Sequence, residues 1–190
     1  HFATGYRTIE DSWHMYVQNQ LFRNLATANF GELTMRIIRD PAMLEYLDND
    51  QNRKGSPNEN LARELMELFA LGEGNDHTEE DIKEGARALT GYTFSDDAFV
   101  FEENRHDSGM KRILGRSGTY NGDDFVRIIL SRPVASEFIC AKLLRFFVND
   151  RPGDPDKETI EVVRGLARTF RRSNYAIKPV LEQLFQSRFF

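Results

Sequence analysis

Apolar residues recur at three- and four-residue intervals along most of this chain, in segments that open with residues typical of helix N-caps. The clearest segment runs from Ser56 to Gly72 and opens on Ser-Pro-Asn-Glu, with Pro at the first helical position. Ser56 and Glu59 have the spacing of a capping box, and Gly72 is a typical C-terminal stop. The apolar residues that share one face of this helix are Leu61, Leu65, Leu68 and Phe69. Such a pattern predicts an amphipathic helix.

Similar patterns predict further helices along the chain. Asp40-Pro41 and Asp154-Pro155 each combine an N-cap with a proline in the first turn. The predicted helices cover residues 11–26, 29–38, 41–47, 56–72, 78–91, 122–130, 133–149, 156–172 and 177–186. We therefore predict an all-α fold, a multi-helix globular bundle.

The pattern changes between Tyr92 and Gly115. Residues 92–94 and 99–101 are rich in aromatic and β-branched residues and flank a short polar turn, which predicts a β-hairpin. Residues 110–114 could add a third strand. We predict one small β-hairpin and loop insertion, at about 92–115, within a single domain that spans residues 1–190.

Composition limits the classes of function. With 190 residues the chain is long enough to bury a core without disulfides, and its 15 Phe predict many aromatic contacts. The formal net charge of −5 gives no general reason to expect a nucleic-acid partner. No apolar run approaches the roughly 18 residues of a membrane-spanning helix, so we predict no transmembrane segment. Cys140, the single cysteine, is expected to be a small buried apolar residue.

Polar side chains are dense on the helix predicted after Ser56. Asn60, Glu64 and Glu67 share a face at i, i+4 and i+7, and carboxylates so placed can bind a metal or act as acid and base. A structural interpretation competes, because Glu59, Arg63 and Glu67 form an i, i+4 ion-pair ladder. Glu64 is the residue that helix chemistry explains least.

A second polar cluster lies in the loop at residues 106–111. His106, Asp107 and Lys111 could supply a ligand, an orienting carboxylate and an anion contact. Asp107 and Gly109 equally suit a tight turn, with Lys111 solvated. Taken over both clusters, the candidate binding residues are Asn58, Asn60, Arg63 and Lys111.

A basic stripe lies on the helix predicted at 156–172. Its members, spaced at i, i+4, i+7 and i+8, are Arg164, Arg168, Arg171 and Arg172. The stripe is either a solvated face or a contact for an anionic surface, such as a sulfated or acidic polymer.

Three segments, 39–48, 58–72 and 106–111, together resemble the bacterial family known as domain of unknown function 1800. Residues 80–82 and 86–92 also fit, although the family more often has Trp where this chain has Tyr92. His1 and Phe2 match the last two positions of the family's Trp-His-x-His-Phe segment, whose first residues are absent here. The resemblance implies an internal fragment, the central and C-terminal part of a longer domain.

The family resemblance also implies a location and a partner, but no activity. Members of the family are commonly exported, which implies a periplasmic or extracellular location. Their genes often neighbour those of sulfatase-like proteins, which implies a sulfatase-like partner.

Two functions from different classes follow. The first is a helical scaffold or binding module that acts outside the cytoplasm. The second is a metal-assisted hydrolase or transferase, with Glu64, His106 and Asp107 as catalytic residues. In that enzyme, His1, Glu64 and His106 would bind a divalent metal ion. The enzyme requires Glu64 and His106 to meet in one cleft, whereas the scaffold predicts a Glu64 ion pair with one of Arg36, Arg39 and Arg87, and an exposed loop.

Overall fold

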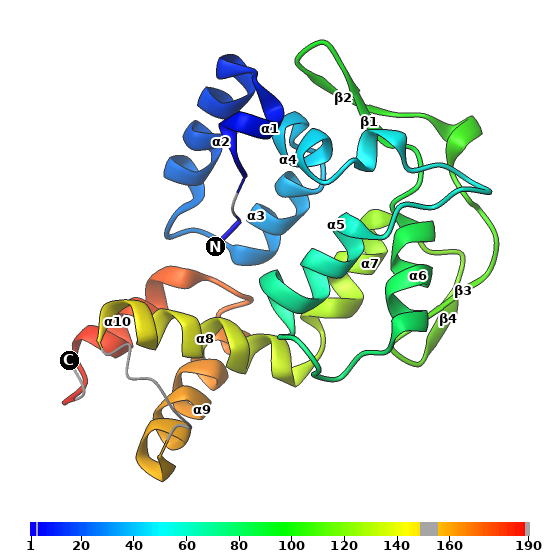
Figure 1. The fold of residues 1–190 in the computed structure, drawn as a ribbon. Coiled ribbons are helices and arrows are strands. Elements are labelled where there is room, and N and C mark those ends of the chain that lie inside the picture. Colours follow the sequence, from blue (N-terminus) through cyan, green and yellow to red (C-terminus); the bar gives the residue numbers. More distant parts are fainter. Residues whose placement is uncertain (3, 149–155, 189–190) are drawn as a thin grey trace.

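The computed structural model describes residues 1–2, 4–148 and 156–188, and most of them are helical (Figure 1). The ten α-helices of this part are α1 (Tyr6–Ile9), α2 (Ser12–Leu25), α3 (Phe30–Ile37), α4 (Pro41–Tyr46), α5 (Asn60–Glu64), α6 (Glu79–Ala88), α7 (Gly122–Leu130), α8 (Pro133–Phe147), α9 (Lys157–Arg172) and α10 (Ile177–Phe185). Shorter helical turns are the 3-10 helices η1 (Asn49–Gln51) and η3 (Glu103–Arg105) and the π-helix η2 (Leu65–Ala70). The strands are β1 (Tyr92–Ser95), β2 (Ala98–Phe101), β3 (Lys111–Ile113) and β4 (Arg116–Gly118). The predicted mostly helical class is confirmed.

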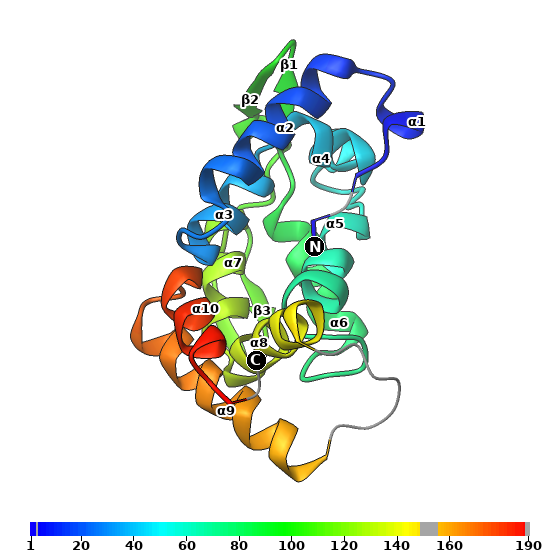
Figure 2. The same ribbon diagram turned by 90° about the vertical axis from the view of Figure 1, so that its left-hand side faces the viewer.

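The loops before α3 and α10 lie side by side, although they are far apart in the sequence. Figure 2 shows α8, α9 and α10 packed together at one end of the molecule and the β1–β2 hairpin at the other. The loop before α3 is joined to the loop before α10 by backbone hydrogen bonds. Phe30 N–H donates to the Tyr175 carbonyl and Ile177 N–H to the Ala28 carbonyl, each at 2.8 Å. Residues far apart in the sequence therefore meet along one side of the molecule.

Several predicted helix starts are confirmed by their side-chain caps. The Asp40 carboxylate accepts a hydrogen bond from Met43 N–H at 2.9 Å, with Pro41 in the first turn of α4. Thr78 and Asp81 form a reciprocal capping box at the start of α6. The N-cap of α9 is Asp156. The N-cap and first-turn proline predicted at Asp154-Pro155 lie outside the described residues.

The capping box predicted at Ser56 and Glu59 is wrong. Helix α5 begins only at Asn60, and Glu59 makes no side-chain cap. The buried Asn52 side chain instead accepts a hydrogen bond from Asn58 N–H at 3.0 Å. This contact holds the segment before the helix in a loop, so Ser56 joins a β-bridge with Arg53 instead. A tertiary hydrogen bond thus overrides the local signal.

The β structure is two hairpins rather than one. Strands β1 and β2 pair as predicted, with Tyr92 opposite Phe101. The predicted third strand exists as β3, but it pairs with β4 in a separate sheet, so the insertion extends to Gly118. The turn of this second hairpin uses Leu114 at φ 48° and Gly115 at φ 80°. Leucine is unusual in that left-handed conformation, so the usual turn signal is missing.

The buried apolar side chains form one continuous cluster that reaches from Phe2 to Leu184. Helices α6 and α7 meet in it at Gly85, where a Cβ atom would lie 2.4 Å from Cζ of the fully buried Phe125. The glycine is therefore required by the close approach of the two helices. Among the described helices, none is both long and apolar enough to cross a lipid bilayer.

We predict opposite effects of alanine at two helical glycines. Gly85→Ala should lower the free energy of unfolding by about 1–3 kcal/mol, because the new methyl group overlaps Phe125. Gly165→Ala in α9 is the matched control, since its nearest neighbours would lie at 3.7 and 3.8 Å. It should raise stability by about 0.5–1 kcal/mol through helix propensity. Urea unfolding of both variants measures the difference, and equal effects would contradict the packing described.

Candidate functional site

The polar residues predicted as a site on α5 are largely used in ion pairs. Arg63 bonds Glu59 at 3.0 Å and Glu67 at 3.2 Å, which confirms the predicted ladder. It also makes two bonds to Glu79 of α6, at 2.8 and 3.0 Å. These bonds raise the pKa of the Arg63 guanidinium, with the side-chain bond to Glu79 as the largest cause. The Arg63 side chain thus ties α5 to α6.

Glu64 has neither of the arrangements predicted for it. It is half-buried, and the described residues include no hydrogen-bond or ion-pair partner for its carboxylate. Burial, and then the charge of Glu67, raise the pKa of Glu64. The expected arginine partners are engaged elsewhere: Arg36 with Glu32, Arg39 with Asp123, and Arg87 with Glu84 and Asp107.

The two candidate asparagines organise the loop before α5. The Asn58 side chain accepts a hydrogen bond from Asn60 N–H at 2.9 Å. The Asn60 amide donates to Asp48 at 3.4 Å. Both residues therefore have local structural contacts.

The loop at residues 106–111 is held together by internal bonds. Asp107 receives two bonds from Arg87, at 2.8 and 3.2 Å, and these lower the pKa of its carboxyl group to about 2. His106 donates from Nδ1 to the Thr90 carbonyl at 2.8 Å. Lys111 is 1% exposed, so its predicted solvation is wrong, and its ammonium donates to the carbonyls of Asp107 and Gly109. The loop thereby anchors the second hairpin to α6.

We predict that the Asp107–Arg87 contact stabilises the fold in a pH-dependent way. Asp107→Asn should lower the free energy of unfolding at neutral pH by about 1–3 kcal/mol, because it weakens a charged hydrogen bond. Since folding depresses this pKa, the stabilisation is complete above about pH 4 and is lost as the pH falls through about 2. The difference between wild type and variant should therefore shrink across that window.

Urea unfolding at a series of pH values measures this difference. The exposed Glu80→Gln, which removes a carboxylate 3.9 Å from Lys83, is the matched control. A difference for Asp107→Asn that stays constant down to the lowest pH would contradict the prediction.

The structure does not assemble the predicted metal ligands. No hydrogen bond or ion pair joins His1, Glu64 and His106 in the part of the chain that the structure describes. Within that part, no group of three or more His, Cys, Asp or Glu is placed to hold a metal ion. The cleft that the enzyme hypothesis requires is therefore not formed by these side chains.

Sequence reasoning missed a buried histidine. His14 is 6% exposed, and its Nδ1 atom lacks a hydrogen-bond partner among the described residues. Three carboxylates from different elements surround the ring: Asp11 at 3.9 Å, Glu45 at 3.7 Å and Asp97 at 3.3 Å. Only Asp11 is near it in the sequence, so no local signal predicted the cluster.

A groove forms where the π-helix η2 ends. Gly72, at φ 94°, terminates the helix and leaves the last carbonyl groups without intrahelical partners. The Leu68 carbonyl accepts a hydrogen bond from Lys142 Nζ at 2.7 Å, and the Phe69 carbonyl accepts one from His1 Nε2 at 2.8 Å. These two bonds bring α8 and the start of the described chain to the same helix end.

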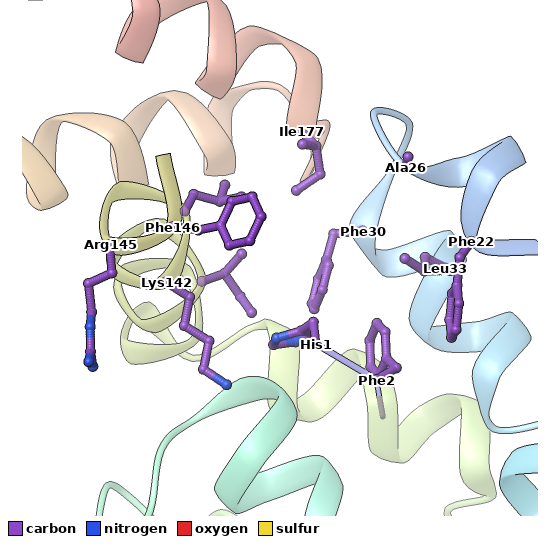
Figure 3. Close-up of a pocket in the computed structure, with 12 residues that line it drawn as sticks. His1, Phe2, Phe22, Ala26, Phe30, Leu33, Lys142, Arg145, Phe146 and Ile177 are labelled. Atoms are coloured by element: carbon purple, nitrogen blue, oxygen red, sulfur yellow. The ribbon is translucent and has the colours of Figure 1, made fainter. Parts of the chain in front are cut away.

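The groove has a volume of about 770 Å³ and lies between α8 and the α2–α3 pair (Figure 3). The α8 wall consists of Ile139, Lys142, Leu143, Arg145 and Phe146. The opposite wall consists of Phe22, Ala26, Phe30 and Leu33, while His1, Phe2 and Ile177 complete the lining. Most of this lining is aromatic or aliphatic, which is typical of small-molecule sites.

Ring contacts fix the central residues of the groove. The Phe2 ring stacks on Phe30 at 5.7 Å between centroids and meets Phe69 edge-on at 5.0 Å. The His1 ring lies 4.7 Å from Phe2 and 5.5 Å from Phe30. Aromatic pairs of this kind add to the burial energy, so the His1 side is pre-formed. In contrast, Phe146 on the α8 wall is 81% exposed.

Of the groove residues, only His1 was predicted as a site residue, and it was predicted as a metal ligand. The other lining residues come from four separate segments, and no segment by itself indicates a groove. The count of 15 Phe was the one signal of aromatic clustering, and it does not say where the rings gather.

Fold and groove together define a mostly helical domain with an apolar groove, bounded by basic side chains. The whole chain, residues 1–190, matches the family described as "Protein of unknown function (DUF1800)". The chain belongs to this family, as its sequence resemblance predicted. Neither the curated proteins nor the solved structures gave a match.

Proposed function

We propose that this domain is a helical binding module whose ligand lies in the groove between α8 and the α2–α3 pair. The observation that carries the proposal is a volume of about 770 Å³ with a mainly apolar lining and a few polar groups. Sites for small molecules have this character, and they measure about 300–1,000 Å³. The exposed Phe146 at the edge supports the same interpretation, because a large exposed apolar side chain beside a groove often marks a binding surface.

In this proposal the polar residues of α5 and of the 106–111 loop have a structural role and do not bind the ligand. Arg63 and Arg87 each join helices and loops through two or more carboxylates. A location outside the cytoplasm and a sulfatase-like partner stay predictions from the family resemblance. Contact of the α9 arginines with an anionic polymer also stays a prediction.

The proposal predicts that an uncharged apolar fluorophore such as N-phenylnaphthylamine binds in the groove. Ala26→Trp should weaken its binding by about tenfold or more, because the indole fills space beside Phe30 and Leu33. Ala26 is exposed, so the variant should fold normally. Fluorescence titration measures the dissociation constants.

Asn24→Trp is the matched control for this experiment. Asn24 is exposed in the last turn of α2, two residues before Ala26, and does not line the groove, so the control adds an equal apolar area elsewhere. Unchanged affinity in Asn24→Trp and weakened affinity in Ala26→Trp support the proposal. Equal affinity in all three proteins, or no binding by the wild type, contradicts it.

The metal-assisted alternative makes a separate prediction. A metal ion that binds only the native state raises the unfolding temperature. Since the described residues contain no group of three metal-binding side chains, we expect zinc, manganese and calcium to leave the unfolding temperature of this chain unchanged. An increase that disappears in Glu64→Gln or His106→Gln would revive the enzyme hypothesis.

A further inference from the structure

The charge of the groove differs in sign from that of the whole chain. The chain has 30 acidic and 25 basic residues, for a net charge of −5. The twelve described residues that line the groove include Lys142, Arg145 and His1 but no acidic residue. Basic groups in a cleft with apolar walls produce a local positive potential, because the walls screen it poorly.

Lys142 is the cation best placed to meet a ligand. Its ammonium donates one hydrogen bond, to the Leu68 carbonyl, and lies 4.7 Å from the centre of the Phe138 ring. An ammonium group has three donors, so it can bond a ligand as well. No carboxylate of the described residues lies within ion-pair distance of it.

The environment of Lys142 favours an added anion. Burial, and then the charge of Arg145, lower the pKa of the Lys142 ammonium. A negative charge beside the ammonium would offset both its loss of hydration and its repulsion by Arg145. Other cations of the fold, such as Arg63 and Arg87, already have carboxylate partners, so Lys142 differs from them in this respect.

The basic side chains Lys142 and Arg145 lie on the α8 wall of the groove, beside the apolar Ile139, Leu143 and Phe146. Lys142 and Arg145 project from α8, whereas the α2–α3 wall presents Phe22, Phe30 and Leu33 (Figure 3). A molecule that fills the groove therefore meets positive charge only on the α8 side and an uncharged, aromatic and aliphatic surface on the opposite side. An amphiphile with a negative head group matches this division.

On the basis of the proposed function, we propose that the ligand of this groove is a single-chain amphiphile with a carboxylate head group. The carboxylate lies at Lys142, and the alkyl chain packs against the phenylalanines of the opposite wall. The volume of about 770 Å³ suits one such chain rather than a macromolecular partner.

Displacement of N-phenylnaphthylamine by three amphiphiles of equal chain length tests the head group. The three are dodecanoate, dodecanol and dodecyltrimethylammonium, each used below its micelle concentration. In the wild-type chain, dodecanoate should displace the fluorophore at about tenfold lower concentration than dodecanol, because its carboxylate bonds a charged donor. The cationic amphiphile should be the weakest, and added salt should reduce the preference for the carboxylate.

Variants of Lys142 locate the head group. Lys142→Met should abolish the preference for dodecanoate while binding of dodecanol persists, and Lys142→Arg should retain the preference. Lys83→Met, at an exposed lysine of α6 outside the groove, removes the same charge and should behave as wild type. Persistent binding of dodecanol shows that the variant is folded with its groove intact.

The outcomes separate this proposal from the function on which it rests. Equal displacement by dodecanoate and dodecanol in the wild type overturns the anionic head group but leaves the binding module in place. If none of the three amphiphiles displaces the fluorophore, although the fluorophore binds, the proposal that the ligand is an amphiphile is overturned. Failure of the fluorophore to bind at all overturns the proposed function itself. A preference that survives in Lys142→Met overturns the position assigned to the carboxylate.

Discussion

Two hydrogen bonds to backbone carbonyls at the end of the π-helix η2 join segments that are far apart in the chain. The last carbonyl groups of a helix have no intrahelical partner and are available to side chains of other segments. The carbonyls of Leu68 and Phe69 find their partners in Lys142 and His1, which are 74 and 68 residues away in the chain. Helix α8 and the first residues of the described chain are therefore held at one point. The space that remains between α8 and the α2–α3 pair is the groove.

Several charged residues hold elements of the fold together. Arg63 connects α5 to α6 through Glu79, and Arg87 connects α6 to the loop that contains Asp107. A half-buried charge is costly unless a partner is close, so these arginines are matched by carboxylates from neighbouring segments. The Lys142 ammonium instead contacts a backbone carbonyl and an aromatic ring. This contrast between matched and unmatched cations distinguishes a structural contact from a candidate binding group.

The sequence predicted those features that depend on neighbouring residues. The predicted cap at Asp40 is local and is present, and the helix predicted to start at Thr78 opens there with a capping box. The turn at Leu114 was not predicted, because leucine rarely adopts a positive φ angle. The π-helix was not predicted, because the apolar residues of segment 65–70 keep ordinary helical spacing. The groove requires four distant segments to meet, so periodicity within each segment cannot reveal it.

A ligand that occupies the groove would also stabilise the fold. One wall belongs to the first helices of the chain and the other to α8, with Ile177 of α10 at one end. These walls face each other only in the native state, since the segments are joined through contacts such as Phe30 to Tyr175. A ligand that needs both walls binds the folded chain and not the unfolded one. By mass action its binding stabilises the association of the early and late helices, so occupancy and the packing of the domain are coupled.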